Sequence, residues 1–163
     1  MRRTVRKIGG IAAALFAGII AAACGSDATG VGAPIYTATL SGANERPTAV
    51  TTTGSGTATF VDNGTSIDWT LTFDGLTNMT VSHIHGPGDA TVAVPVMINL
   101  FFAAGNTGAP KPITVHGQFN NSANQAVSLD SLRVLFNNGK SYANVHTTAN
   151  PGGEIRGQIA RSN

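Results

Sequence analysis

The segment Ile67-Asp68-Trp69-Thr70-Leu71-Thr72-Phe73 decides the fold class, because its apolar and polar residues alternate without a break. Successive side chains of a β-strand point to opposite faces, so one face of this segment would be apolar and the other polar. Trp69, the only tryptophan in the chain, falls on the apolar face. We therefore predict a half-buried strand with Trp69 directed into the core.

Seven further segments have strand-forming composition, and turn-forming residues separate many of them. The predicted strands cover residues 36–40, 56–61, 79–85, 92–99, 113–119, 142–147 and 154–160. Turn signals occur at Asp62-Asn63-Gly64, Asp74-Gly75, Gly86-Pro87-Gly88 and Asn150-Pro151-Gly152-Gly153. Short strands at this spacing predict an all-β domain, an antiparallel Greek-key-like β-sandwich or barrel.

One segment departs from the strand pattern and favours a helix. Ser128 can cap its first turn, and Gly139 follows its end as a stop signal. Its apolar residues recur at helical spacing, at Leu129, Leu132, Leu135 and Phe136. We predict one short helix near residues 129–138, covering one mouth of the sandwich or barrel.

The first 23 residues differ in kind from the rest of the chain. Four basic residues within the first seven precede an uncharged run from Ile8 to Ala23. This is the pattern of an export signal peptide. The run is also shorter than the ~20 residues that a membrane-spanning helix needs. We therefore expect residues 1–23 to be the signal peptide of an exported bacterial protein.

Cys24, the only cysteine, follows three alanines. Small residues before a cysteine resemble the lipobox of bacterial lipoproteins, in which the thiol is acylated and the cysteine becomes the new N-terminus. The same residues also satisfy the rule of ordinary signal peptidase, which would give an unanchored secreted protein. We predict lipidation at Cys24 and a flexible tether over 24–34. The domain at 35–161 would then lie in the cell envelope, facing the periplasm or the cell surface.

Removal of the signal peptide reverses the net charge. The chain has ten Lys and Arg against eight Asp and Glu, and four of the basic residues lie within 1–23, which leaves six against eight. The basic character therefore belongs to the precursor and gives no support for nucleic-acid binding. The membrane is expected as a partner only through the lipid anchor. A single cysteine also permits no internal disulfide, so the fold must rely on its core.

Four histidines carry most of the candidate chemistry, because the sequence has no phosphate-binding glycine loop, nucleophile elbow or paired-cysteine motif. His83 and His85 lie two residues apart on a predicted strand, so both side chains leave the same face. If His146, near the end of another strand, meets them, three imidazoles can hold copper or zinc. The alternative is that the histidines hydrogen-bond the neighbouring turns and hold them in register. His116 is predicted on an exposed polar face.

Charged residues near the histidines are candidates for the rim of the site. Glu154 begins a predicted strand and can approach the same rim as His146. Glu154 and Arg156 lie two apart on one strand face, where a surface ion pair or cross-strand contact is the ordinary explanation. Glu45 precedes Pro47 in a loop, as a rim contact or as solvated charge. We treat Glu45, Glu154 and Arg156 as candidate rim residues.

Several of these segments together resemble a known family. They are Ser82-His83-Ile84-His85-Gly86-Pro87, Tyr142-Ala143-Asn144-Val145-His146-Thr147 and Asn150-Pro151-Gly152-Gly153-Glu154-Ile155-Arg156-Gly157-Gln158-Ile159. They resemble the CHRD domain, the module repeated in chordin and found in many exported bacterial proteins. Residues 40–47 fit the start of that domain, and the resemblance covers about Tyr36 to Ile159. It implies an extracellular β-sandwich and assigns no activity.

Two function classes follow. The first is a non-catalytic envelope module whose loops bind a protein, a glycan or a small molecule; the second is a copper- or zinc-binding protein that uses the histidines. The His83-Ile84-His85 strand also resembles the copper-binding strand of copper/zinc superoxide dismutases. The disulfide pair of those enzymes is absent, and no bridging histidine or zinc-ligand series can be placed. We therefore favour the binding module over the metal-binding protein, and either of these over an enzyme.

Overall fold

The computed structural model describes residues 32–102, 112–122 and 126–163. These residues belong to one compact unit, Val31–Asn163. The predicted signal peptide, Cys24 and the tether up to residue 31 lie outside the described residues. No helix in the described part of the chain is long and apolar enough to cross a membrane.

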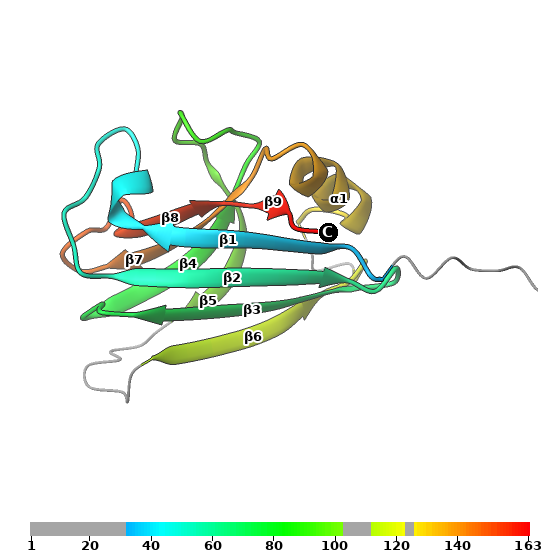
Figure 1. Ribbon diagram of the computed structural model, residues 1–163, viewed down its shortest axis with the longest axis horizontal. Helices are drawn as coiled ribbons and strands as arrows, with labels where there is room; N and C mark the ends of the chain where they lie inside the picture. The colour runs from blue at the N-terminus through cyan, green and yellow to red at the C-terminus, as the bar shows by residue number, and fades with distance from the viewer. Residues whose placement is uncertain (1–31, 103–111, 123–125) are drawn as a thin grey trace, which may run out of the picture. The chain divides into compact units, whose positions relative to one another are not determined.

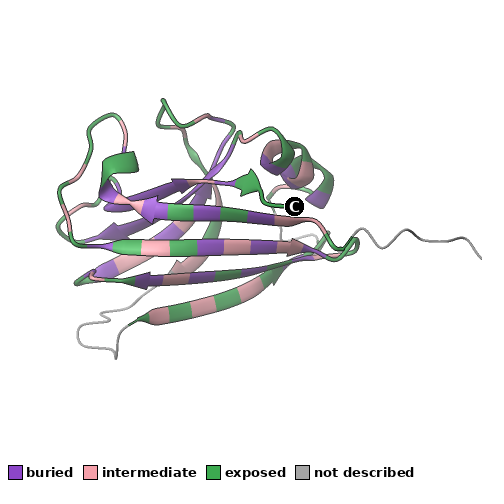
Figure 2. Cartoon of the chain, in the orientation of Figure 1, coloured by how far each residue is buried: buried purple, intermediate pink, exposed green. Residues whose placement is uncertain are grey.

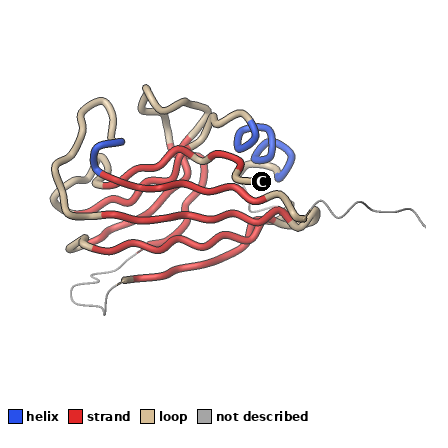
Figure 3. Tube along the Cα trace, viewed as in Figure 1, coloured by secondary structure: helices blue, strands red, loops and turns tan. Residues whose placement is uncertain are grey.

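The described residues form an antiparallel sheet with one α-helix (Figure 1). The strands are β1 (Ile35–Ser41), β2 (Ser55–Asp62), β3 (Ile67–Asp74), β4 (Met79–His85), β5 (Val96–Phe102), β6 (Ile113–Phe119), β7 (Tyr142–Thr147), β8 (Ile155–Gln158) and β9 (Ala160–Arg161). A short 3-10 helix, η1 (Gly42–Asn44), follows β1, and the helix α1 (Leu129–Asn137) precedes β7. The strand order is β5-β4-β7-β8-β1-β2-β3-β6, with β9 paired to β1. The prediction of an antiparallel all-β domain with one short helix is confirmed (Figure 3).

The sheet is a nearly closed barrel with one open seam. β5 and β6 stand at the two ends of the strand order. Met97 of β5 and Phe119 of β6 nevertheless line the same cavity. The two edge strands therefore flank one opening, and of the two architectures predicted the barrel describes the molecule better.

The core follows from the alternation of β3 and its neighbours. Ile67, Trp69, Leu71 and Phe73 are buried, whereas Asp68 and Thr70 are exposed, and Figure 2 shows the alternating colours along the strand. β2 supplies the matching apolar positions, since Phe60 pairs with Trp69 and Ala58 with Leu71. The predicted orientation of Trp69 is thus confirmed, with only 7% of the residue exposed.

The helix α1 packs beside the start of β1 and the end of β2. The Ser128 side chain accepts a hydrogen bond from the Ser131 backbone N–H, so Ser128 is the N-cap, as predicted. Gly139, past the helix end, has a φ of 58°, a left-handed conformation that favours glycine. Phe136 packs on Tyr36 and Phe60, with ring centroids 5.3 and 5.0 Å away. The helix is therefore held by core contacts as well as by its cap.

Two predicted strand boundaries were wrong. The strand predicted over residues 92–99 begins only at Val96, because Pro95 has no N–H for the ladder and the Val94 carbonyl accepts hydrogen bonds from side chains. The strand predicted over residues 154–160 is divided into β8 and β9, since the Ile159 N–H donates to the Ser141 carbonyl. Glu154 stands just before β8 instead of within it.

The strands β4, β7 and β8 have an apolar inner face and a polar outer face. Ile84, Val145 and Ile155 belong to the core cluster, and the residues that alternate with them point away from it. These outer residues include His83, His85, Tyr142, Asn144, His146 and Arg156. Most of them are nonetheless buried, because the loops at residues 42–54 and 86–95 contact them. The result is a polar layer enclosed between the sheet and two loops.

Candidate metal centre

His83, His85 and His146 meet on this outer face. β4 and β7 are neighbours in the sheet, and His146 pairs with Val81 while His83 pairs with Asn144. His83 and His146 are therefore diagonal neighbours on one face, a spacing within reach of imidazole rings. The three ring centroids lie 4.7 to 5.8 Å apart. The strand geometry thus brings together the three histidines that the sequence singled out.

The pairing of β4 with β5 is irregular at the two histidines of β4. The register shifts between Ser82 and His83, and again between Ile84 and His85. Such bulges bend a strand locally and re-aim its side chains, and they occur often beside functional sites. The two irregularities therefore lie at His83 and His85, whose side-chain orientations determine whether the three histidines meet.

Backbone carbonyls fix the tautomers of two of the histidines. His85 Nδ1 lies 2.8 Å from the Val94 carbonyl oxygen, and His146 Nδ1 lies 3.0 Å from the carbonyl oxygen of Pro151. A carbonyl only accepts hydrogen bonds, so in both rings Nδ1 carries the proton and Nε2 keeps its lone pair. This arrangement, in which the second nitrogen is held by a carbonyl, is the one found around histidines that ligate metals.

Ring nitrogens of the three histidines face one another. His83 Nδ1 lies 3.0 Å from His146 Nε2, and His85 Nε2 is buried with no hydrogen-bond partner. Potential ligand atoms of the three residues all lie within 4.8 Å of one another. Two nitrogens bound to one tetrahedral zinc ion are about 3.4 Å apart, since each bond is about 2.0–2.1 Å long. The most widely separated pair would therefore have to approach by about 1.4 Å for all three nitrogens to bind one ion.

All three imidazoles are held neutral. Burial lowers the pKa of His83 to about 4, with further lowering by the neighbouring His146 and His85. Burial also lowers the pKa of His85 and of His146, against the opposing effect of their hydrogen bonds to Val94 and Pro151. Neutral imidazole is the form that ligates metals, so the site favours a cation bound through nitrogen over a proton.

A comparison with protein families agrees with this description of the fold. The model of the CHRD domain matches residues 36–159, which include every strand from β2 to β8 and all three clustered histidines. The chain belongs to the CHRD domain family. A comparison with curated proteins finds no match.

Glu154 of the CHRD domain does not join the histidine cluster. Its two carboxylate oxygens accept hydrogen bonds from the hydroxyls of Thr52 and Thr147, each 2.6 Å long. Burial raises the pKa of this carboxyl, but the hydrogen bonds lower the pKa by more. The pKa of Glu154 therefore lies below its usual value. Glu154 therefore ties the loop of residues 42–54 to the end of β7.

Glu45 and Arg156 are buried in the same polar layer, although the sequence suggested surface positions for them. Glu45 is 2% exposed and accepts a hydrogen bond of 3.4 Å from the Asn144 side chain. Burial raises its pKa to about 7, against the lowering effect of the nearby Arg156. Arg156 is 1% exposed and lies 3.5 Å above the centre of the Tyr142 ring. Neither the predicted surface pair of Arg156 with Glu154 nor another salt bridge to Arg156 occurs among the described residues.

Tyr142 contacts the histidine cluster, although the sequence did not single it out as a candidate site residue. Its hydroxyl donates to the Val94 carbonyl at 3.2 Å and accepts from the Val94 N–H at 3.1 Å, and its ring stacks on His85 at 4.8 Å. Tyr142 thus supports the same carbonyl that orients His85. A signal existed, because Tyr142, Asn144 and His146 are spaced by two along one strand and share its outer face.

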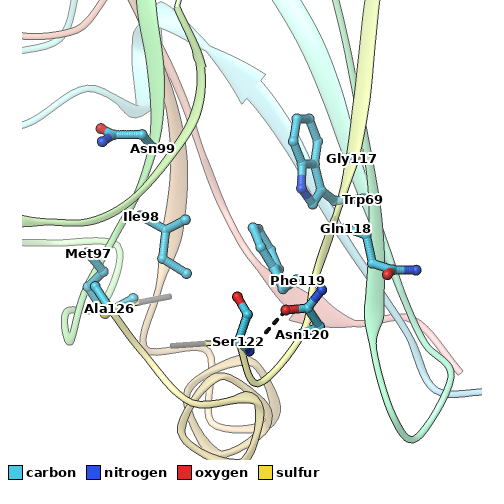
Figure 4. A pocket seen from close by; sticks show the side chains of 10 residues that line it. All are labelled: Trp69, Met97, Ile98, Asn99, Gly117, Gln118, Phe119, Asn120, Ser122 and Ala126. Carbon is cyan, nitrogen blue, oxygen red and sulfur yellow. Dashed lines mark hydrogen bonds between the residues drawn. The ribbon is translucent and has the colours of Figure 1, made fainter. Parts of the chain in front are cut away.

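The remaining histidine and a larger cavity lie elsewhere. His116 is exposed on β6, as predicted. The cavity occupies the seam between β5 and β6 and has a volume of about 500 Å³. Figure 4 shows Met97 and Ile98 on one side of it and Trp69 and Phe119 on the other. The seam is therefore a second place where a ligand can contact the domain.

Proposed function

We propose that this CHRD domain is a binding module of the bacterial envelope that holds one copper or zinc ion through His83, His85 and His146. One observation carries the proposal: His85 Nε2 is buried, aprotic and unpaired within a cluster of neutral imidazoles. A buried acceptor without a donor costs about 1–3 kcal/mol, and a bound cation would remove this cost.

The hydrogen bonds of the histidines to the turns do not compete with this role. Each of His85 and His146 uses Nδ1 for a loop carbonyl and has Nε2 left for the cluster. The two interpretations drawn from the sequence, structural and metal-binding, are therefore compatible in one arrangement. If the role were only structural, nothing would require the second nitrogens to converge.

The donor set favours copper and zinc over other cations. Three imidazole nitrogens suit Cu(II) and Zn(II), whereas magnesium and calcium prefer oxygen ligands. Copper binds nitrogen sites more tightly than zinc in the usual affinity order. A bound ion would supply Lewis acidity and, for copper, one-electron redox chemistry. The protein's part is to orient three imidazoles and keep them unprotonated.

Calorimetric titration of the tag-free, metal-free protein with copper and with zinc tests the proposal. We expect one ion per chain, and we expect the His83→Ala, His85→Ala double variant to lose this binding. His116→Ala is the matched control, since it removes an exposed histidine on β6. Equal binding by the wild type and the double variant would show that the metal proposal is wrong.

The cellular setting remains part of the proposal. A basic N-terminus, an uncharged run and a cysteine after three alanines support export and lipidation at Cys24. The bound metal would then lie outside the cytoplasm, on a domain attached to a membrane by its N-terminus.

A second candidate function rests on the seam cavity. Its volume of about 500 Å³ lies in the range of small-molecule sites, and its walls combine Trp69, Phe119 and Ile98 with polar side chains at the rim. This would make the domain a module for a small apolar ligand, the first of the two classes considered from the sequence. Titration with anilinonaphthalene sulfonate tests it: Trp69 emission should change on binding, and Ile98→Lys should abolish the change. An unchanged Trp69 emission at saturating probe would rule out this cavity as the site.

A further inference from the structure

Arg156 is a buried cation without a carboxylate partner. Its side chain donates to the Asp89 backbone carbonyl at 2.9 Å and lies over the Tyr142 ring. In the described part of the chain, the salt bridges are Arg133 with Asp62, Arg133 with Asp130 and Lys140 with Asp89. A buried guanidinium is costly unless an opposite charge compensates it. The position therefore calls for an anion.

The two nearest carboxyl groups do not supply the missing charge in full. The carboxyl of Asp89 is taken by Lys140, 3.0 Å away, and by Thr91, whose hydroxyl is 2.6 Å away. The Glu45 carboxyl is buried, and its pKa of about 7 leaves it only partly ionised at neutral pH. A second guanidinium, that of Arg46, adds positive charge close to Arg156. The carboxyl groups near Arg156 and Arg46 therefore compensate the two guanidinium charges only in part.

A small cavity lies between these two cations. It has a volume of about 80 Å³ and is lined by Asn44, Arg46, Ala90, Arg156 and Gln158. This volume exceeds the share of one water molecule, about 30 Å³, and is too small for a drug-sized ligand. The cavity therefore fits an anion of a few heavy atoms.

Gln158 adds a second requirement to the ligand. Its side-chain N–H group donates to the carbonyls of Gly88 and Gly139, at 2.9 and 2.7 Å. Its Oε1 is therefore left as an acceptor. This atom is buried without a donor, and Gln158 lines the cavity. A ligand that brings an O–H group would satisfy Oε1, while its charged oxygens accept hydrogen bonds from the guanidiniums.

We propose that the cavity between Arg46 and Arg156 binds a small oxyanion that carries a hydroxyl group, with bicarbonate as the representative. Planar guanidinium groups match the geometry of a planar, two-oxygen anion better than that of a spherical halide. Bicarbonate combines such a pair of oxygens with one O–H donor for Gln158.

The anion site and the histidine cluster are separate sites on one polar layer. β7 lies between β4 and β8 in the sheet, so His85 approaches the Tyr142 ring from the β4 side and Arg156 from the β8 side. The proposal uses no metal ligand, and it stands whether or not the histidines hold an ion.

The test is thermal unfolding and calorimetry of the purified protein, kept metal-free by a chelator at pH 7 in closed cells. Sodium bicarbonate, acetate and chloride are compared at constant ionic strength, with sodium gluconate, whose anion is too large for the cavity, as the balancing salt. We expect a saturable rise in Tm with bicarbonate, a smaller rise with acetate and the smallest with chloride. The His83→Ala, His85→Ala variant should respond as the wild type does.

Arg46→Gln is the decisive variant, because Arg46 is only half-buried and the variant is expected to fold. It should lose at least tenfold in bicarbonate affinity while keeping the far-ultraviolet circular dichroism of the wild type. Arg161→Gln is the matched control, since Arg161 is an exposed arginine on β9, and it should leave the affinity unchanged. Absence of saturable binding, an equal effect of chloride, or full binding by folded Arg46→Gln would each overturn the proposal.

Discussion

The Nδ1 atom of His83 lies 3.0 Å from the Nε2 atom of His146, across 63 positions of sequence. Because the Pro151 carbonyl holds the proton of His146 on Nδ1, His146 Nε2 must be the acceptor and His83 Nδ1 the donor. His146 Nε2 cannot accept this hydrogen bond and bind a cation at the same time. In the metal-free cluster, the proton on His83 Nδ1 therefore occupies the position between these two nitrogens where an ion would bind.

The first prediction concerns that proton. Metal-free protein should show Nδ1–H tautomers for His83, His85 and His146 in long-range nitrogen-proton NMR spectra. Addition of zinc should move the His83 proton to Nε2, as Nδ1 becomes a ligand, and should leave the other two tautomers unchanged. Zinc binding without a change at His83 would show that this ring ligates through a different atom or not at all.

The second prediction concerns acid stability without metal. The folded state lowers the pKa of the three clustered histidines, to about 4 for His83, whereas the unfolded value is about 6.5. Between these values the unfolded chain binds more protons, so the free energy of unfolding falls as the pH drops from about 6.5 toward about 4. The His83→Ala, His85→Ala variant should show a shallower dependence in urea unfolding at a series of pH values. An equally steep curve for this variant would remove the histidines as the cause.

The third prediction concerns Trp69 and the glycine across from it. Trp69→Ala should lower the free energy of unfolding by about 3–5 kcal/mol, because it empties a core position beside Phe119. Gly117→Ala should cost about 1–3 kcal/mol, since the added Cβ would lie 2.5 Å from Trp69 Cζ2. Urea unfolding measures both, and native Trp69 emission should be blue-shifted. A water-like emission maximum would contradict the burial of Trp69.

The fourth prediction concerns the contact of α1 with the sheet. Arg133 donates to both carboxylate oxygens of Asp62 at 2.8 Å, and this hydrogen bonding holds the pKa of Asp62 below its usual value. Asp62→Asn should therefore cost about 1–2 kcal/mol near neutral pH. The wild type should lose the same contribution as the pH falls through the lowered pKa.

Asp130→Asn is the control for this ion pair, because Asp130 also contacts Arg133 but its side chain is 87% exposed. It should cost less than about 0.5 kcal/mol, as exposed ion pairs do. Chemical denaturation at pH 7 and pH 3 compares the two variants. Equal losses for both would indicate that burial of Asp62 does not strengthen the pair.

The fifth prediction concerns Cys24, which lies outside the described residues. The mature protein should begin at a lipidated Cys24, and Cys24→Ser should release the domain from the membrane in soluble form. Intact-mass analysis of wild-type protein from membranes decides the point. An unmodified thiol at the mature N-terminus would refute lipidation and leave export standing.

Features encoded by local periodicity could be predicted from the sequence. The alternation around Trp69 gave the core face of β3, and the leucine spacing with Ser128 gave the helix and its cap. The pair His83 and His85 was placed on one face by strand geometry alone. Each of these depends on residues close in sequence, so no knowledge of the remaining fold was required.

Features that depend on distant segments could not be predicted in the same way. Alternation places Arg156 on the outer face of β8, where exposure is the ordinary expectation. The side chain is buried only because residues 42–54 and 86–95 lie over that face. The same loops decide where the Val94 carbonyl meets His85, and they shorten the strand predicted at 92–99. The position of a loop leaves no periodic pattern in the sequence. The burial of this polar layer could therefore not be predicted from the sequence.

The division between an apolar inner face and a polar outer face has a consequence for how this domain can diverge. Core residues such as Ile84 and Val145 support the barrel, while their immediate neighbours His83 and His146 would hold the proposed ion. Selection can therefore act on alternate positions of the same strand almost independently. Copies that keep every inner residue and replace the outer ones should share one architecture and differ in ligand, so a family can spread through many proteins without a common chemistry.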